Sequence, residues 1–203
     1  GCHRFSDGKH PSTDHKWDIA NTIRISQMNK PPLYGVAIDD AHQYYGDLPD
    51  HNGGWIMVRA AKLDVPSLLA AMNRGDFYAS TGVTLKDVQY DPAAKTLTVE
   101  VDPQEGVHYE IRFIGTMKNY DRTTRQIEDN QPDKHTITVY SDDVGKTLKT
   151  VKGAKATYQL TGDELFVRAH VLSDRNLKDK NEFGKFFQAD ALTQPYGWER
   201  HLK

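Results

Sequence analysis

The chain has 203 residues, of which 37% are hydrophobic and 27% are charged, and its formal net charge is -2. This length and composition fit one large or two small globular domains. The two signs of charge are mixed along the sequence, and no basic stripe is present to neutralise phosphates, which argues against nucleic acid as the main partner. The longest apolar runs are too short to cross a membrane.

Residues 1 to about 84 alternate helical and strand-like patterns. Capping residues around Ser12 precede a predicted helix over residues 14–28, and the pair Pro31-Pro32 ends it. One side of this helix is expected to carry Trp17, Ala20 and Ile23.

A short apolar run follows at residues 36–38 and is typical of a buried strand. The polar cluster after it would lie at the carboxyl end of that strand, where α/β folds gather ligand and catalytic groups. Asp40 and His42 are two residues apart, so on a continuing strand both side chains point to one face and can share a divalent metal ion. The alternative is that Asp39 and Asp40 cap a turn and that His42 is a loop residue.

A second strand is predicted at residues 55–60, after a polar loop that contains His51. Asp64 is a suitable N-cap for a helix over residues 65–74, with Pro66 in its first turn and Gly75 at its end. Alternation of strands and helices indicates an α/β unit, in which neighbouring strands tend to be parallel.

From about Leu85 the hydrophobic period changes to two. Short strands separated by turn signals are expected at residues 97–101, 109–113, 137–139, 148–151, 156–160, 166–171 and 186–191. The polar segments 118–134 and 173–185 are expected to be loops. The predicted fold class is therefore α+β, with a partial α/β unit over residues 1–84 followed by an antiparallel β-sandwich over residues 85–203.

The run that contains Asp40 and His42 is similar to the last metal-binding motif of the PHP family (polymerase and histidinol phosphatase): Leu33-Tyr34-Gly35-Val36-Ala37-Ile38-Asp39-Asp40-Ala41-His42. Further segments resemble a bacterial branch of that family, in the family's order: Trp17-Asp18-Ile19, Gly54-Trp55-Ile56-Met57-Val58-Arg59-Ala60, Gly75-Asp76-Phe77-Tyr78-Ala79-Ser80-Thr81-Gly82 and Thr193-Gln194-Pro195. Proteins of the family are metal-dependent phosphoesterases on a distorted α/β barrel, and in this branch a β-rich region follows the barrel.

The resemblance implies that Asp40 and His42 are two ligands of a cluster of divalent metal ions, with Zn, Mn or Fe suited to the mixed oxygen and nitrogen set. Candidates for contacts with substrate or with the ligands are Asp39, His51, Arg59 and His10. Arg59 on its strand suits a phosphate, although a structural salt bridge is the commoner role for such a residue. Histidines of the β-rich half, such as His170 and His201, are expected to be surface residues.

The family's first motif, His-x-His, and its later His, Glu and Asp ligands have no counterpart in this sequence. The chain is therefore interpreted as the C-terminal part of a larger phosphoesterase or as a natural truncation, inactive by itself because two ligands cannot hold a catalytic cluster. Its implied small-molecule partner is a phosphoester, and a second copy would cover strands that an incomplete barrel exposes. The alternative is a non-catalytic β-sandwich module for binding or accessory roles.

The single cysteine, Cys2, excludes an intramolecular disulfide. A Gly1-Cys2 start fits the remnant of a lipoprotein lipobox, and Gly1 fits equally the remnant of an expression tag. The sequence thus leaves both the bacterial cytoplasm and an exported lipoprotein open.

Overall fold

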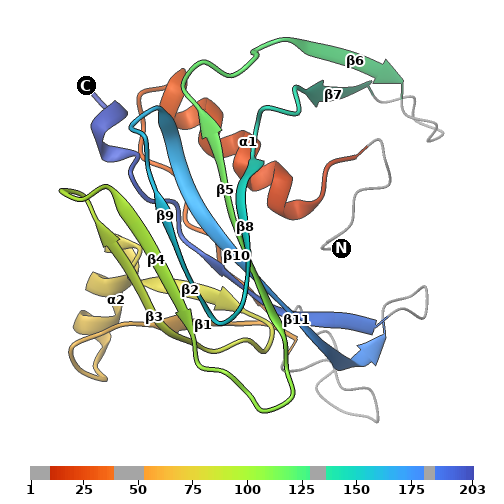
Figure 1. Cartoon of the computed structure of the whole chain (residues 1–203). Coiled ribbons are helices and arrows are strands. Elements are labelled where there is room, and N and C mark those ends of the chain that lie inside the picture. Colours follow the sequence, from red (N-terminus) through yellow and green to blue (C-terminus); the bar gives the residue numbers. More distant parts are fainter. Residues whose placement is uncertain (1–9, 39–52, 129–135, 181–185) are drawn as a thin grey trace.

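The computed structural model of the chain describes residues 10–38, 53–128, 136–180 and 186–203 (Figure 1). Antiparallel sheets dominate it. The largest sheet has the strand order β1-β2-β11-β10-β5-β8. Its strands are β1 (Trp55–Val58), β2 (Phe77–Ser80), β5 (Tyr109–Met117), β8 (Lys146–Lys152), β10 (Glu164–Lys180) and β11 (Phe186–Thr193).

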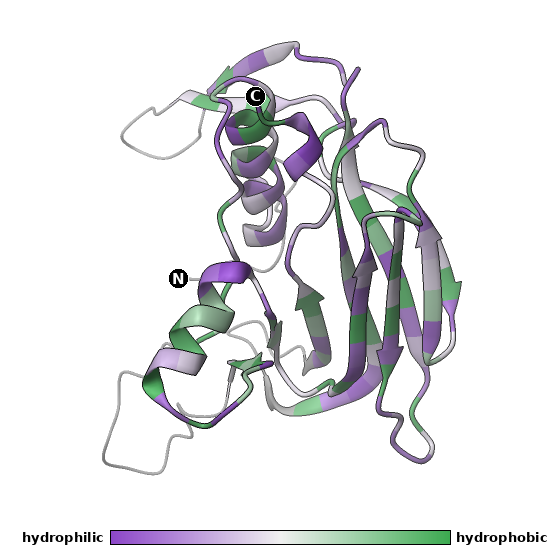
Figure 2. Cartoon of the chain, turned by 90° about the vertical axis from the view of Figure 1, so that its left-hand side faces the viewer, coloured by the Kyte–Doolittle hydropathy of each residue, from purple (hydrophilic) through white to green (hydrophobic). Residues whose placement is uncertain are grey.

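A second sheet has the order β3-β4-β9, and a separate hairpin consists of β6 and β7. The bounds are β3 (Leu85–Asp91), β4 (Thr96–Val101), β6 (Thr124–Glu128), β7 (Thr136–Tyr140) and β9 (Lys155–Gln159). The helices are α1 (Thr13–Ser26), α2 (Val65–Arg74) and the short 3-10 helix η1 (Glu199–His201). Both α-helices lie to one side of the strand layers (Figure 2). Neither is long and apolar enough to cross a membrane.

The side chains of β10 alternate between the two faces of the larger sheet, so this strand contributes to the packing on both faces. Val167, Ala169 and Val171 join the main core, to which Leu97 and Val99 of the second sheet also contribute. The residues between them face α1: Arg168 binds Asp18, and His170 lies near Asp14. The two sheets thus share one apolar core, while α1 covers the opposite face of the larger sheet.

Helix α1 packs on the sheet through a polar side. Ser12 caps it by accepting a hydrogen bond from the His15 N–H at 3.2 Å. Its buried residues are Asp18, Asn21, Thr22 and Ile25, whereas the expected side of Trp17, Ala20 and Ile23 is only half-buried. The expectation is wrong because the sheet presents polar partners: Thr22 bonds Thr116 at 2.8 Å, and Arg168 bonds Asp18.

Helix α2 confirms the predicted caps. The Asp64 carboxylate accepts a hydrogen bond from the Ser67 N–H at 2.8 Å, and Pro66 stands in the first turn. Gly75 ends the helix in the left-handed conformation with φ of 77°, which glycine adopts without steric cost.

The structure corrects the predicted fold class. Strands β1 and β2 are antiparallel, with Trp55 opposite Ser80, and β2 pairs with β11 in turn. Helix α2 therefore joins two antiparallel neighbours and is not the crossover of a parallel α/β unit. The chain is a mostly antiparallel β-rich protein, and strands from both sides of residue 84 share one sheet.

Three local predictions are also wrong. Residues 36–38 form no strand, because side chains rather than a neighbouring strand satisfy the backbone just before them. The polar segment 118–134 contains β6, and β10 extends to Lys180, so two expected loops are partly strands. Polarity misleads there because β6 and β7 have largely solvated faces and pair through the backbone, with a Thr138–Gln126 side-chain bond.

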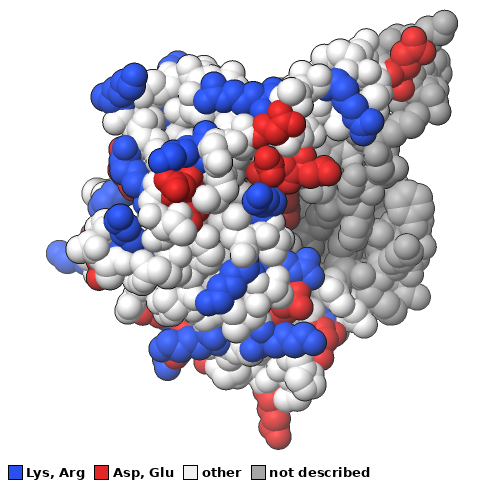
Figure 3. Space-filling model, turned by 45° about the horizontal axis from the view of Figure 1, so that its top comes forward, with Lys and Arg blue, Asp and Glu red and all other residues white. Residues whose placement is uncertain are grey.

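Surface charges are interspersed over the face drawn in Figure 3. Many are paired. Glu100, for example, accepts from the Lys155 ammonium at 2.6 Å and the Lys86 ammonium at 2.7 Å, and these bonds lower the pKa of Glu100 to about 2. Because opposite charges are paired in this way, neither sign of charge dominates this face.

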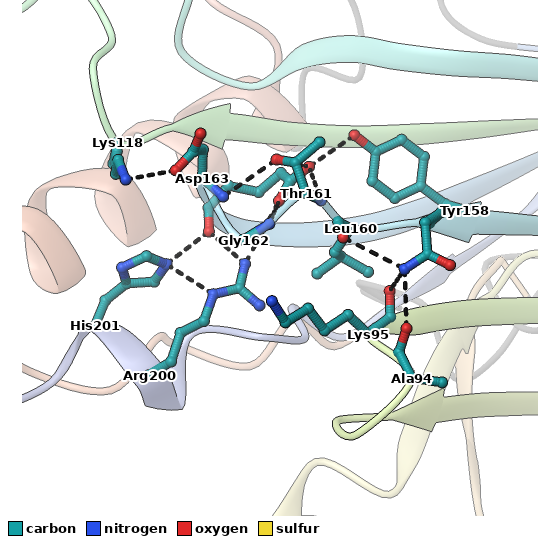
Figure 4. Close-up of polar contacts among 12 residues, drawn as sticks. Ala94, Lys95, Lys118, Tyr158, Leu160, Thr161, Gly162, Asp163, Arg200 and His201 are labelled. Carbon is teal, nitrogen blue, oxygen red and sulfur yellow. Dashed lines mark hydrogen bonds and ion pairs between the residues drawn. The ribbon is translucent and has the colours of Figure 1, made fainter.

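Glu164, at the start of β10, is a fully buried carboxylate. It organises the tight turn of Thr161, Gly162 and Asp163, which Figure 4 shows in close-up. It accepts hydrogen bonds from the Thr161 and Gly162 N–H groups at 3.1 and 3.0 Å and from the Tyr158 hydroxyl at 3.0 Å. Burial raises the pKa of Glu164, but these hydrogen bonds outweigh it and hold the pKa below 4.5. Burial, together with the hydrogen bond from the Tyr158 hydroxyl to Glu164, raises the pKa of Tyr158.

We expect Asp18→Asn to reduce the free energy of unfolding by about 3–5 kcal/mol, because it leaves the Arg168 guanidinium buried without its counter-charge. The exposed pair Lys146–Asp143 provides the control, and Lys146→Gln should cost less than about 1 kcal/mol. Urea denaturation of both variants measures the difference. Equal effects of the two substitutions would contradict a stabilising role for the buried pair.

We also expect Glu164 to make stability sensitive to acid. Since its folded pKa is lowered, its contribution is complete above the unfolded pKa, near 4.5, and is lost as the pH falls through the folded value. Denaturation midpoints of the protein and of Glu164→Gln should therefore converge as the pH is lowered below about 4. A constant difference between the two across this range would refute the assignment.

Candidate functional site

The residues predicted to hold metal lie outside the described part of the chain. Asp39, Asp40, His42 and His51 all fall within residues 39–52. His10 is half-buried and stands two residues before the cap of α1. Within the described ranges, no group of three His, Cys, Asp or Glu residues is placed to hold a metal ion. The described structure does, however, fix the segment that leads to Asp40 and His42.

That segment, residues 33–38, is held by side chains acting in place of a strand. The Gln194 amide bonds both backbone groups of Gly35: Gly35 N–H donates to Gln194 Oε1 at 2.8 Å, and Gln194 Nε2 donates to the Gly35 carbonyl at 2.9 Å. Asn21 of α1 bonds both backbone groups of Leu33 at 2.7 and 3.2 Å. The Trp17 indole N–H donates to the same Leu33 carbonyl at 2.8 Å. Side chains of α1 therefore hold the backbone at Leu33, and Gln194 holds it at Gly35, shortly before the chain reaches Asp40.

Three close approaches make the segment fit its surroundings. A Cβ atom at Gly35 would lie 3.0 Å from the Trp17 ring, and one at Gly75 would lie 2.8 Å from the Tyr34 ring. At the other end, a Cβ atom at Gly54 would lie 3.1 Å from the Ala37 Cβ. The segment thus runs from α1, past the end of α2, to the start of β1. A side chain would collide at Gly75, whereas at Gly35 and Gly54 it would fit only if the neighbouring atoms shifted slightly.

A cleft of about 760 Å³ lies beside this segment, between the ends of β1 and α2 and the outer strand β3. Six aromatic side chains line it: Tyr34, Phe77, Tyr78, Tyr90, Tyr196 and Trp198. Tyr90 and Tyr196 are stacked with ring centroids 5.5 Å apart, and Tyr34 meets Phe77 edge-on at 6.0 Å. The volume is within the range of about 300–1,000 Å³ typical of small-molecule sites.

Arg59 follows β1 and crosses this cleft. Its guanidinium donates to the Asp87 carboxylate at 2.5 Å and to the Val88 carbonyl at 3.2 Å, both on β3. The side chain therefore links the edges of the two sheets. Its charge is thus paired with a carboxylate of the protein, although the side chain remains 61% exposed.

A second polar group, which sequence reasoning misses, lies where β10, β11 and β2 meet. Asp190 accepts a hydrogen bond from the Thr81 hydroxyl at 2.6 Å and contacts His170 Nε2 at 3.0 Å. The His170 side chain is 15% exposed, and Asp14 lies 3.9 Å from its Nδ1. His170 was expected to be a surface residue, and this expectation is wrong. Its side chain points to the face of β10 opposite Val171, and α1 covers that face. His201 is likewise half-buried, against the Glu164 carbonyl at 2.7 Å.

Comparisons of the chain with protein-family models, with characterised proteins and with solved structures returned no match.

We expect Gln194→Ala to free residues 33–38 while leaving the sheets folded, because it removes both hydrogen bonds to Gly35. Hydrogen exchange read by mass spectrometry should show faster exchange in a peptide covering this segment. Gln126→Ala, on the exposed strand β6, is the matched control and should leave that peptide unchanged. Unaltered exchange in Gln194→Ala would show that Asn21 and Trp17 hold the segment without it.

Proposed function

We propose that this chain is the C-terminal, non-catalytic portion of a larger metal-dependent phosphoesterase resembling the PHP family. One observation carries the proposal. Among the described residues, every large hydrophobic side chain with high exposure lies in one third of the chain: Met28, Leu33, Val36, Ile38, Trp55, Met57, Leu63, Val65 and Leu69. The β-rich part of the chain buries its large apolar side chains, whereas this third leaves them exposed to solvent.

The most informative members of this set are the side chains that flank the path to Asp40, and we call them the apolar surface: Val36, Ile38, Trp55 and Met57. Their exposed fractions are 57%, 65%, 38% and 42%. Val36 and Ile38 belong to a segment with strand-like composition, and Trp55 and Met57 lie on one face of β1, the outermost strand of its sheet. Exposed apolar side chains so grouped are typical of an interface.

We assign the upstream part of the same protein as the occupant of this surface. The sequence of residues 33–42 resembles the end of a metal-binding strand, and Asp40 and His42 follow the exposed Ile38 by only a few residues. Docking at the apolar surface would place these two side chains next to whatever ligands the upstream part supplies. An aspartate and a histidine suit Zn, Mn or Fe, and such a metal would lower the pKa of a bound water and neutralise phosphate oxygens.

Extension of the chain with its upstream sequence should produce metal binding and phosphoesterase activity that the 203-residue chain lacks. The measurements are calorimetric titration with Zn²⁺ and Mn²⁺ and hydrolysis of p-nitrophenyl phosphate. In the longer protein, Asp40→Asn and His42→Ala should abolish both properties. His108→Ala, an exposed histidine paired with Asp174, should change neither. Full activity in the 203-residue chain would overturn the non-catalytic assignment.

The same two proteins test the docking separately from the chemistry. The short chain should bind the apolar dye ANS, and Val36→Lys combined with Ile38→Lys should weaken that binding, as should the upstream extension. Light scattering distinguishes the occupants: a monomeric short chain agrees with the proposal. A dimer that the double substitution dissociates would identify a second copy as the occupant and contradict it.

A further inference from the structure

The cleft between β1 and β3 is a second candidate site, which borders the apolar surface at Met57 but is otherwise lined by different residues. It is walled by two aromatic pairs with fixed geometry, Tyr90 with Tyr196 and Tyr34 with Phe77. Rigid aromatic walls provide large contact area at little cost in side-chain entropy, because each ring has only two rotatable bonds. A cleft built in this way suits a ligand with a flat, partly apolar face.

Two hydroxyl groups in the cleft are available to a ligand. Within the described chain, neither the Tyr34 hydroxyl nor the Tyr196 hydroxyl makes a hydrogen bond, although Tyr196 is largely buried and burial raises its pKa to about 12. Neither oxygen is sealed from solvent, because Arg168 Nη1 is the only fully buried side-chain polar atom without a partner in the described part of the structure. Both phenols can therefore donate and accept hydrogen bonds.

The charge of the cleft disfavours a strongly ionic ligand. Three basic and four acidic side chains line it: Arg59, Arg74, Lys86, Asp76, Asp87, Asp91 and Glu199. Each basic group has a carboxylate partner: Arg59 bonds Asp87 at 2.5 Å, Arg74 bonds Asp76 at 2.8 Å, and Lys86 bonds Glu100 at 2.7 Å. A phosphate would have to displace one of these partners while lying near Glu199, whose electrostatic influence reaches Tyr34 and Tyr90.

We propose that this cleft binds a neutral saccharide of one to a few units. The pyranose ring presents C–H groups on its faces, which pack on aromatic rings, and hydroxyl groups at its edge, which bond phenols and paired carboxylates. Both requirements are met here by side chains already held in place, and the mixed charges provide both hydrogen-bond donors and acceptors. This inference concerns binding alone and is independent of the metal-site proposal.

The test is ligand-observed saturation-transfer NMR and calorimetry on the 203-residue chain without metal. The neutral probes are methyl glucoside, maltose and cellobiose, and the charged comparators are glucosamine and glucuronate. At least one neutral probe should bind with a millimolar dissociation constant and shift backbone resonances of β1 and β3. Preferential binding of either comparator, or no binding by any neutral probe, would overturn the proposal.

Substitutions locate the binding in the cleft. Tyr196→Phe and Tyr34→Phe each remove a single hydroxyl group and should weaken binding of the neutral probe about fivefold. Tyr140→Phe removes a hydroxyl group on β7, outside the cleft, and should leave the affinity unchanged. Thermal unfolding of the three variants establishes that they are folded, and either cleft variant suffices if the other is not. Unchanged affinity in a folded cleft variant would place the binding elsewhere and refute the assignment.

Discussion

The buried ion pair between Asp18 and Arg168 determines how the rest of the structure is arranged. Two parallel hydrogen bonds of 2.7 Å join the carboxylate to the guanidinium, and both side chains are 2% exposed. Burial alone would lower the pKa of Arg168, but the Asp18 charge raises it above its ordinary value. A buried charge is very costly without its partner. Helix α1 consequently has one favourable position on the sheet, with Asp18 opposite Arg168 of β10.

That position extends to the next part of the chain through neighbouring residues of α1. Trp17 lies over the guanidinium, with the Arg168 Cζ 5.1 Å from its ring, and its indole N–H holds the Leu33 carbonyl. Asn21, one turn further on, bonds the same residue. A cation–carboxylate pair inside the protein therefore orients the backbone that leads toward residue 40. Loss of the pair would be expected to disturb this segment as well as the helix.

The sequence predicted elements well where local signals are strong. Helix α2 has Asp64, Pro66 and Gly75 at its ends, and β4 alternates apolar and polar residues, so periodicity and capping alone locate both. The sequence could not predict pairing. Nothing near Phe77 indicates that β2 joins β11 more than a hundred residues later, and this long-range contact is what makes the fold antiparallel rather than α/β.

The site shows the same division between local and distant information. Glycines at 35, 54 and 75 are visible in the sequence, but the atoms that crowd them come from other parts of the chain. The buried side of α1 was misjudged because hydrophobic periodicity assumes an apolar counterpart, and the sheet offers Arg168 and Thr116 instead. The cleft, too, combines residues from six separate stretches of the chain. No single sequence motif could therefore have predicted it.

The Gln194 side chain has a consequence for how such a protein could be assembled. A primary amide can direct one N–H donor and its carbonyl acceptor to the same neighbour, as a single residue of an antiparallel strand does with its own N–H and C=O. At Gly35 it therefore imitates the neighbouring strand that a sheet would provide. A strand that arrived there could take over both hydrogen bonds, provided that the amide of Gln194, a residue that is 1% exposed here, reached new partners in solvent. In the described structure the amide fills that place and holds the segment at Gly35.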